Sequence, residues 1–348
     1  PLVEEIHQEW SSWVTQVVRT YQDKNYVEIE WLVGPIPVDD DVGKEIINHF
    51  KFEEFITNKH LSTQTQMEGS YKKIYDNHTI YLFNINYQIL SRLRIKDYRE
   101  TYDLPLYAEP VSRNYYPVTA QFVLNSVNGQ GSAAVLNDRA QGGTSLGDGQ
   151  IELMVHRRLL HDDAFGVGEA LNEQAYGVGL VARGRHLVLH SDSATSDCDF
   201  GCQRRTLAEE ILLQPIITFS DPSTFTTVMK SGLSAPLPDN IHLLTLEPWS
   251  SSGTWLLRLE NFYEVNESSL SESVDVDLES LFSEWTVSNI RELVLGANAY
   301  KEDVVRLRWN SQSEVMNNAQ EGKVKVSEAV YSFSPMQIRT FLIDVTQK

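Results

Sequence analysis

The sequence predicts a mainly β fold, built from β-sandwich or super-β-sandwich domains with few short helices. Short runs of alternating or β-branched residues recur along the chain, separated by turns rich in Gly, Ser, Asn and Asp. The chain has 348 residues, and a single hydrophobic core stops growing at about 250 to 300 residues. More than one β domain is therefore expected.

A hairpin is predicted near the start of the chain. Residues 27–33 alternate between apolar and charged side chains, which places every second residue on one face of a strand. The β-branched and aromatic run at 13–21 precedes it, with a polar turn at 22–25. Further strands are expected at residues 118–124, 133–137, 186–190, 241–246, 256–259, 304–309 and 338–345. Helical signals are limited to residues 152–160 and, ambiguously, 274–282.

A group of prolines near the middle of the sequence suggests two domains. Four prolines interrupt the stretch between Leu213 and Pro238, so we divide the chain into β-sandwich domains at residues 1–215 and 216–348. The segment at about 51–80 is polar and lacks clean periodicity, which predicts a surface insertion in the first domain.

Charge and hydropathy argue against two classes of partner. The net charge of −19 disfavours nucleic acid, because phosphates are bound by clustered Lys and Arg. No apolar run reaches the roughly 18 to 20 residues of a membrane-spanning helix, so no membrane partner is expected. The chain starts at Pro1 with no signal-peptide pattern, which suggests a processed piece of a longer protein.

Three local features suggest the secretory pathway. Cys198 and Cys202 lie in a short polar stretch, and we favour a small disulfide-closed loop over two free thiols. Asn77 and Asn266 each begin an Asn-x-Ser/Thr sequon within a polar segment, as expected for glycosylated loops. Together they indicate an oxidising compartment.

The densest polar cluster is His-Arg-Arg-Leu-Leu-His-Asp-Asp at residues 156–163. His156, His161 and Asp162 are suitable zinc ligand types, but no established zinc spacing is present, so no metal site is expected in this chain. Asp162 and Asp163 would point to opposite faces of a strand, whereas a retaining glycosidase needs facing carboxyl groups about 5 Å apart. We expect them to pair with arginine. A solvated, salt-bridged turn stays open as the simpler interpretation of the whole cluster.

A glycine-rich stretch at residues 142–147 offers no catalytic motif. Ser145 does not match the Gly-x-Ser-x-Gly nucleophile elbow, and the glycines lack the spacing of a phosphate or dinucleotide loop. They are predicted to be turn residues.

Three ordered motifs carry a family resemblance. They are Asn-Tyr-Tyr-Pro-Val at 114–118, Asp-Arg-Ala-Gln-Gly-Gly-Thr-Ser-Leu at 138–146, and the segment 148–163 that ends in the polar cluster. They closely resemble lysosomal α-mannosidases of glycoside hydrolase family 38. Weaker similarity extends over most of the chain outside the predicted insertion, and the chain matches the β domains in the C-terminal part of that family.

The resemblance implies a retaining, zinc-dependent exo-α-mannosidase that trims mannose from glycoprotein oligosaccharides in the lysosome or after secretion. The family's nucleophile and zinc ligands lie in an N-terminal β/α domain, so no catalytic residue and no metal ligand is expected in this chain. Zinc would be bound by the N-terminal catalytic chain, which is the expected partner beside the mannose-bearing oligosaccharide. The family's cleaved members also suggest a homo-oligomer of processed chains.

Carried over by motif, Arg158 is the family's basic residue that reaches towards the mannose pocket, and Arg157 is its neighbour. A guanidinium suits this role because it offers several donors to sugar hydroxyls and keeps its charge. An interdomain ion pair is the alternative for Arg158.

Two departures from the family pattern keep other functions open. Residues 80–87 replace a family glycine turn, and Phe165 stands where arginine is usual. Either change is compatible with a non-catalytic binding or structural protein derived from the α-mannosidase scaffold. A third hypothesis is a stand-alone carbohydrate-binding sandwich using aromatic side chains such as Trp249 and Tyr263.

Overall fold

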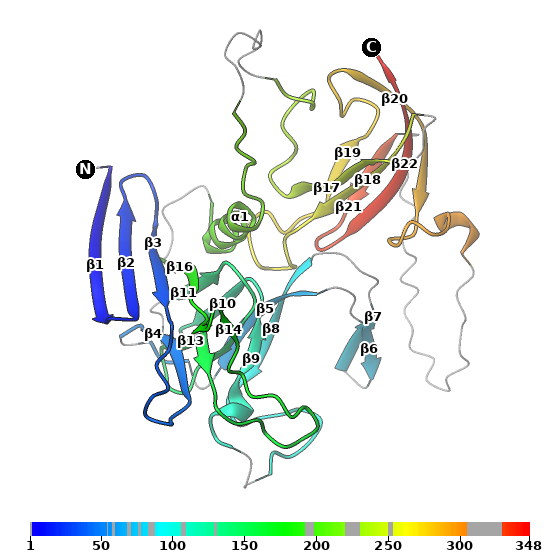
Figure 1. Cartoon of the computed structure of the whole chain (residues 1–348). Coiled ribbons are helices and arrows are strands. Elements are labelled where there is room, and N and C mark those ends of the chain that lie inside the picture. Colours follow the sequence, from blue (N-terminus) through cyan, green and yellow to red (C-terminus); the bar gives the residue numbers. More distant parts are fainter. Residues whose placement is uncertain are drawn as a thin grey trace. The chain divides into compact units, whose positions relative to one another are not determined.

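The computed structural model divides the chain into two compact units. Unit 1 comprises Pro1–Gln66 and Ile89–Gln214, and unit 2 comprises Met67–Gln88 and Pro215–Lys348. The structure describes residues 2–53, 55–57, 60–67, 71–75, 78–82, 88–105, 109–128, 131–191, 198–219, 230–249, 253–304 and 329–348. Within these ranges, no helix is long and apolar enough to cross a membrane. Figure 1 shows the predominance of strands, so the predicted mainly β fold is confirmed.

Unit 1 contains a large antiparallel sheet in the order β1-β2-β3-β16-β11-β10-β5-β8. Its strands are β1 (Val3–Ser11), β2 (Val14–Tyr21), β3 (Tyr26–Val33), β16 (Ala182–Ser191), β11 (Ser132–Asn137), β10 (Gln121–Asn125), β5 (His60–Met67) and β8 (Gln88–Ile95). The hairpin predicted near the start of the chain is β2–β3, and its polar turn lies between Tyr21 and Tyr26.

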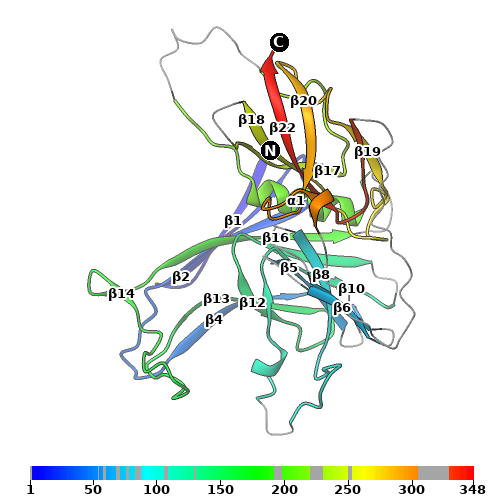
Figure 2. The same ribbon diagram turned by 90° about the vertical axis from the view of Figure 1, so that its right-hand side faces the viewer.

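A smaller sheet in the order β4-β13-β12-β9 faces the large one, as Figure 2 shows. It consists of β4 (Lys44–Lys51), β13 (Gln150–Arg158), β12 (Gln141–Thr144) and β9 (Tyr116–Val118), the last preceded by the 3-10 helix η1 (Ser112–Asn114). Phe122 and Val135 of the large sheet pack against Ile151 and Leu153 of β13 in one buried cluster. Unit 1 is therefore a β-sandwich closed by apolar side chains from both layers.

Helix α1 (Phe200–Leu212) belongs to unit 1 and packs on the large sheet. Asp199 caps it, since its side chain accepts a hydrogen bond from the backbone N–H of Cys202 at 2.9 Å. The predicted disulfide between Cys198 and Cys202 is present across this first turn. Buried residues of α1 and of the sheet form one cluster, whose members include Leu207, Ile211, Leu187 and Leu189.

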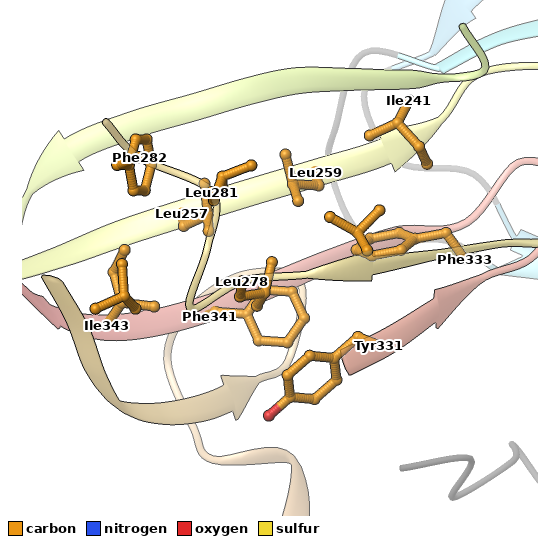
Figure 3. Packing of buried hydrophobic residues seen from close by; sticks show 12 residues of the cluster. Ile241, Leu257, Leu259, Leu278, Leu281, Phe282, Tyr331, Phe333, Phe341 and Ile343 are labelled. Atoms are coloured by element: carbon orange, nitrogen blue, oxygen red, sulfur yellow. The ribbon is translucent and has the colours of Figure 1, made fainter. Parts of the chain in front are cut away.

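Unit 2 is built on a sheet in the order β17-β18-β22-β20. Its strands are β17 (Ile241–Pro248), β18 (Thr254–Asn261), β22 (Ile338–Gln347) and β20 (Trp285–Leu293), with the pair β19 (Val274–Asp277) and β21 (Val330–Phe333) beside them, the 3-10 helix η3 (Lys301–Asp303), and the ribbon β6 (Tyr71–Tyr75) and β7 (His78–Leu82). Figure 3 shows Leu257 and Leu259 of β18 with Phe341 and Ile343 of β22, which share one buried core cluster with Phe333 of β21.

Several element predictions need correction. Residues 152–160, expected to be helical, are mostly strand β13, because eight of its residues pair with β4. The ambiguous segment 274–282 starts as strand β19. Residues 60–67, placed in the expected insertion at about 51–80, form β5 and pair with β10, so this part belongs to the sheet. The strand predicted at 304–309 lies outside the described residues beyond Val304.

Candidate functional site

Strand β13 carries both arginines of the polar cluster at its C-terminal end. It pairs with β4 from Gln150 opposite Lys51 to Arg158 opposite Lys44. Successive side chains in a strand point to opposite faces, so Arg157 and Arg158 have different surroundings. Arg157 is exposed, whereas Arg158 is half-buried.

The Arg158 guanidinium is held by two hydrogen bonds. Nε donates to Asn172 Oδ1 and Nη1 donates to the Ile36 carbonyl, each at 2.7 Å. Gly179 lies directly against it, because a Cβ at that position would come within 2.7 Å of Nη1. Nη2 donates to no group among the described residues. The guanidinium is thus fixed on one side, with a donor pair left for another molecule.

The loop after β13 folds back onto Arg158. The backbone N–H of Leu159 donates to the Leu171 carbonyl at 2.9 Å and closes the loop. The short hairpin of β14 (Gln174–Ala175) and β15 (Val178–Gly179) then brings Gly179 to the guanidinium. Arg158 therefore joins the loop, the hairpin and the Ile36 carbonyl.

Arg157 lies on the outer face of the small sheet. Its Nη1 is 3.8 Å from Glu45 Oε2, and the Arg157 side chain is 48% exposed. Ion pairs as exposed as this contribute little to stability, at most about 1 kcal/mol. The geometry therefore separates a loosely held Arg157 from a firmly positioned Arg158.

A tyrosine–glutamate pair on the same outer face was not anticipated from the sequence. Tyr115 Oη donates to Glu152 Oε2 at 3.1 Å, and Glu152 lies opposite the exposed His49 of β4. Burial and the nearby Glu152 charge raise the pKa of Tyr115 well above its ordinary value. The Tyr115 hydroxyl therefore stays a hydrogen-bond donor at neutral and acidic pH. Both residues lie in the family-like motifs, and this position was the signal in the sequence that could have identified the pair.

The Lys-Asp-Tyr-Arg segment at residues 96–99 meets the start of the Asn-Tyr-Tyr-Pro-Val motif through side chains. Asn114 Nδ2 donates to Asp97 Oδ1 at 2.9 Å, and Arg113 Nε donates to the same oxygen at 2.9 Å. These hydrogen bonds, with Asn114 contributing most, hold the pKa of Asp97 below its usual range. Arg99 Nη1 also donates to Tyr116 Oη at 2.6 Å. The Lys-Asp-Tyr-Arg segment at 96–99 thus anchors the loop that carries Tyr115.

Contrary to our expectation, the acidic pair after β13 forms no ion pair with an arginine among the residues that the structure describes. Asp162 Oδ2 accepts from the backbone N–H of Ala164 at 2.9 Å, and Asp163 Oδ1 accepts from that of Phe165 at 3.0 Å. Short side chains of this type commonly satisfy backbone donors two residues ahead. Asp162 and Asp163 are therefore turn-forming residues, and the turn presents Phe165, which is 92% exposed.

The predicted metal-ligand types do not gather at one point. His156 Nε2 is 3.0 Å from the Leu180 carbonyl, and His161 and Asp162 are exposed on the loop. In the described ranges, no group of three or more His, Cys, Asp or Glu side chains has the arrangement of a metal site.

The glycine-rich stretch forms strand β12 and not only turns. A Cβ on Gly143 would come within 2.9 Å of the Val118 and Leu153 side chains, and one on Gly142 would come within 2.7 Å of Met154 Sδ. Glycine is needed here for close packing, so the turn prediction was wrong for both residues. Ser145 is buried, and its Oγ donates to the Gly147 carbonyl at 3.1 Å.

The remaining candidate residues lie apart from Arg158 in the sequence. Asn266 is exposed in a turn with a positive φ of 61°, as a glycosylation acceptor requires access. Asn77 lies outside the described residues. Tyr263 is fully buried and offers no stacking platform, whereas Trp249 is 48% exposed.

Comparison with known proteins gives two family matches. Residues 1–165 match the glycosyl hydrolases family 38 C-terminal domain, and residues 240–341 match the glycosyl hydrolases family 38 C-terminal beta sandwich domain.

Curated relatives align along nearly the whole chain. The lysosomal alpha-mannosidase of Felis catus is 40% identical over 99% of this chain and 32% of the relative. That of Homo sapiens is 38% identical over 100% of this chain and 32% of the relative. The alpha-mannosidase of Canavalia ensiformis is 35% identical over 99% of this chain and 34% of the relative. The chain thus spans about a third of the length of the curated relatives it matches.

Proposed function

This chain belongs to glycosyl hydrolase family 38, in which it corresponds to the C-terminal domains, and we propose that it completes a retaining exo-α-mannosidase. The substrate would be a terminal α-mannose on a glycoprotein oligosaccharide. The nucleophile and the catalytic carboxylates would come from an N-terminal catalytic chain, and this chain would contribute part of the sugar pocket's wall. Relatives named lysosomal alpha-mannosidase support a lysosomal or secreted location.

The observation that carries the proposal is the fixed orientation of the Arg158 guanidinium. Two hydrogen bonds fix the guanidinium plane, while Nη2 keeps its two N–H donors unengaged within the described part of the chain. A fixed cation with a free donor pair suits recognition of sugar hydroxyls, because little side-chain entropy is lost on binding. Arg158 would therefore orient the mannose without taking part in proton transfer.

Zinc, which the family resemblance implies, does not fit the residues of this chain that the structure describes. No suitable group of ligands occurs among the described side chains. We accordingly assign zinc to the N-terminal catalytic part and derive no step through it here.

Arginine replacement in the complete enzyme tests the proposal. Arg158→Lys removes the guanidinium, whose several N–H donors would bind Asn172, the Ile36 carbonyl and the sugar at the same time. Each hydrogen bond to a charged group contributes roughly 1.5 to 3 kcal/mol, so kcat/KM for p-nitrophenyl α-mannoside should fall by about 10- to 100-fold. The matched variant Arg157→Lys, at the neighbouring exposed position, should stay within about twofold. Equal activity of the Arg158→Lys enzyme and the unchanged enzyme would refute the pocket role.

The second candidate is a non-catalytic binding or structural protein on the same scaffold. The exposed Phe165, where the family usually has arginine, is the observation in its favour. Absence of mannoside turnover in the complete protein, with the glycan still bound, would select this function over the first.

A further inference from the structure

The first strand of unit 1 continues the core face of the large sheet. Directly opposed residues in an antiparallel sheet share a face, and the register opposes Ile6 to Val18 and Val18 to Ile29. Ile29 and Trp31 are two residues apart on β3 and therefore share that face as well. Ile6 thus lies on the side of the sheet that carries the buried Trp31.

The cover over this face ends before it reaches β1. Trp31 is 2% exposed because Ile46 of β4 and Val155 of β13 pack against its cluster. Ile6 is 62% exposed, although it lies on the same face. Leu2 and Trp10, four residues before and after Ile6, are 77% and 67% exposed, and we call Leu2, Ile6 and Trp10 the β1 ledge.

The backbone of β1 is open to pairing as well. Among the strands that the structure describes, β1 is the last of its sheet and pairs only with β2, as Figure 1 illustrates. Its pairing is regular from Val3 to Glu9, with an irregularity only between Glu9 and Ser11. The strand contains no Pro or Lys, which are the residues that commonly protect an edge. An additional strand can therefore hydrogen-bond along β1.

The charge of β1 determines which kind of strand can pair with it. β1 carries Glu4, Glu5 and Glu9, and its one basic candidate, His7, lies 3.1 Å from Glu5. The neighbouring cation, Arg19, is already held by three carboxylates from β1 and β3. These carboxylates are Glu5 at 2.5 Å, Glu28 at 3.0 Å and Glu30 at 2.6 Å. The open edge is therefore acidic and favours a basic partner strand.

The same charges disfavour a second copy of β1. Antiparallel pairing of two β1 strands about His7 would place Glu5 opposite Glu9 on both sides. Like charges directly opposed in a sheet destabilise the pairing. This chain, by contrast, covers 32% of the length of the family relatives, so about two thirds of each relative lies outside it and is available as a partner.

We propose that a basic strand from the part of the α-mannosidase polypeptide outside this chain adds to β1 and covers the β1 ledge with apolar side chains. This inference rests on the proposed function for the identity of the partner. The added strand would extend the large sheet and bury Ile6 and Trp10, whose exposed area otherwise remains in water.

Photocrosslinking in the complete enzyme tests the interface. With Ile6→p-benzoylphenylalanine, irradiation should produce one dominant crosslink to a peptide outside this chain that contains Lys or Arg. The same probe at Val127, which is 58% exposed in a turn of unit 1, should not label that peptide. In hydrogen exchange, amides of residues 3–9 should exchange at least tenfold faster in the Ile6→Asp enzyme than in the unchanged one, whereas Val127→Asp should leave them unaltered.

Each other outcome overturns the inference. A crosslink to a second copy of this chain, or to a peptide without Lys or Arg, would refute the proposed partner. Absence of a crosslink, or equal exchange in the Ile6→Asp and unchanged enzymes, would refute docking altogether. None of these readouts requires turnover, so they stay separate from the Arg158 assay that tests the proposed function.

Discussion

His186 and Gln141 link the two sheets of unit 1 by a hydrogen bond of 2.8 Å between His186 Nε2 and Gln141 Oε1. His186 lies on β16 of the large sheet and Gln141 on β12 of the small one. Asn48 Nδ2, on β4, donates to the other ring nitrogen at 2.9 Å, so Nε2 carries the proton and the ring is neutral. The buried ring also packs between Trp31 and Phe50.

Acidification should destabilise unit 1 through His186. Burial, opposed by Asp138 and aided by Arg139, lowers the pKa of His186 from 6.5 to about 4. The pKa of His186 is lower in the folded state than in the unfolded state. The neutral His186 ring therefore contributes fully to the unfolding free energy above pH 6.5, and this contribution is lost as pH falls towards 4. The shift in pKa between the unfolded and folded states corresponds to a loss of about 3 kcal/mol of unfolding free energy in acid. Urea unfolding at pH 7, 5.5 and 4 measures it.

A glutamine at position 186 separates this effect from other titrations. His186→Gln cannot gain the proton, so its unfolding free energy should change less between pH 6.5 and 4 than that of the unchanged protein. His190→Gln, at an exposed position of the same strand, should keep the original pH dependence. Parallel pH curves for the unchanged and His186→Gln proteins would contradict the assignment.

A methyl group at Gly179 should displace Arg158. The new Cβ would meet Nη1 at 2.7 Å, which is closer than real Cβ contacts allow, so the guanidinium must move. Displacements of about 1 Å near a reacting site reduce rates by up to about 100-fold, so kcat/KM of the complete enzyme should fall at least about tenfold. Gly168→Ala, in the loop that follows β13 and with open space around it, serves as the control and should retain activity.

The buried ion pair of unit 2 should be sensitive to loss of charge. Arg339 Nε and Nη2 donate to the two carboxylate oxygens of Glu292 at 2.9 and 2.8 Å, and the Arg339 side chain is 9% exposed. Glu292→Gln should lower the unfolding free energy by about 2 kcal/mol at pH 7, because a charge-assisted bidentate pair is lost. Thermal unfolding measures it, with Glu284→Gln as the control at an exposed pair with Lys230.

The same pair should weaken in acid. Burial acts to raise the pKa of Glu292, but the hydrogen bonds and charges of Arg339 and Lys301 outweigh it, so the pKa lies below 4.5. The stabilisation is therefore present above pH 4.5 and is lost as pH falls below that value. The loss of unfolding free energy caused by Glu292→Gln should therefore be smaller in the most acidic buffers. A cost that grows on acidification would be inconsistent with the pair.

Both sequons should carry glycans in a eukaryotic secretory host. Asn266 lies in an exposed turn, and Asn77 begins the other sequon. Asn77→Gln and Asn266→Gln should each reduce the mass by one N-glycan, and the double variant should not change on deglycosylation. Intact mass spectrometry before and after deglycosylation gives the count.

Local patterns in the sequence were sufficient for the β class, the β2–β3 hairpin and the disulfide. Period-two alternation and turn residues act over a few neighbours, so these features need no tertiary information. Helix α1 was missed because Arg204 and Arg205, adjacent and both buried, obscure its apolar face. Residues 152–160 were misassigned as helix because only pairing with β4 makes them a strand.

The motif itself identified the family and singled out Arg158, with Arg157 as its neighbour. Only the tertiary structure decided that Arg158 is the positioned one, since Asn172, the Ile36 carbonyl and Gly179 come from distant parts of the chain. The physical reason is that a guanidinium acquires a fixed orientation from groups that folding brings to it, and a linear pattern records the residue but not those contacts.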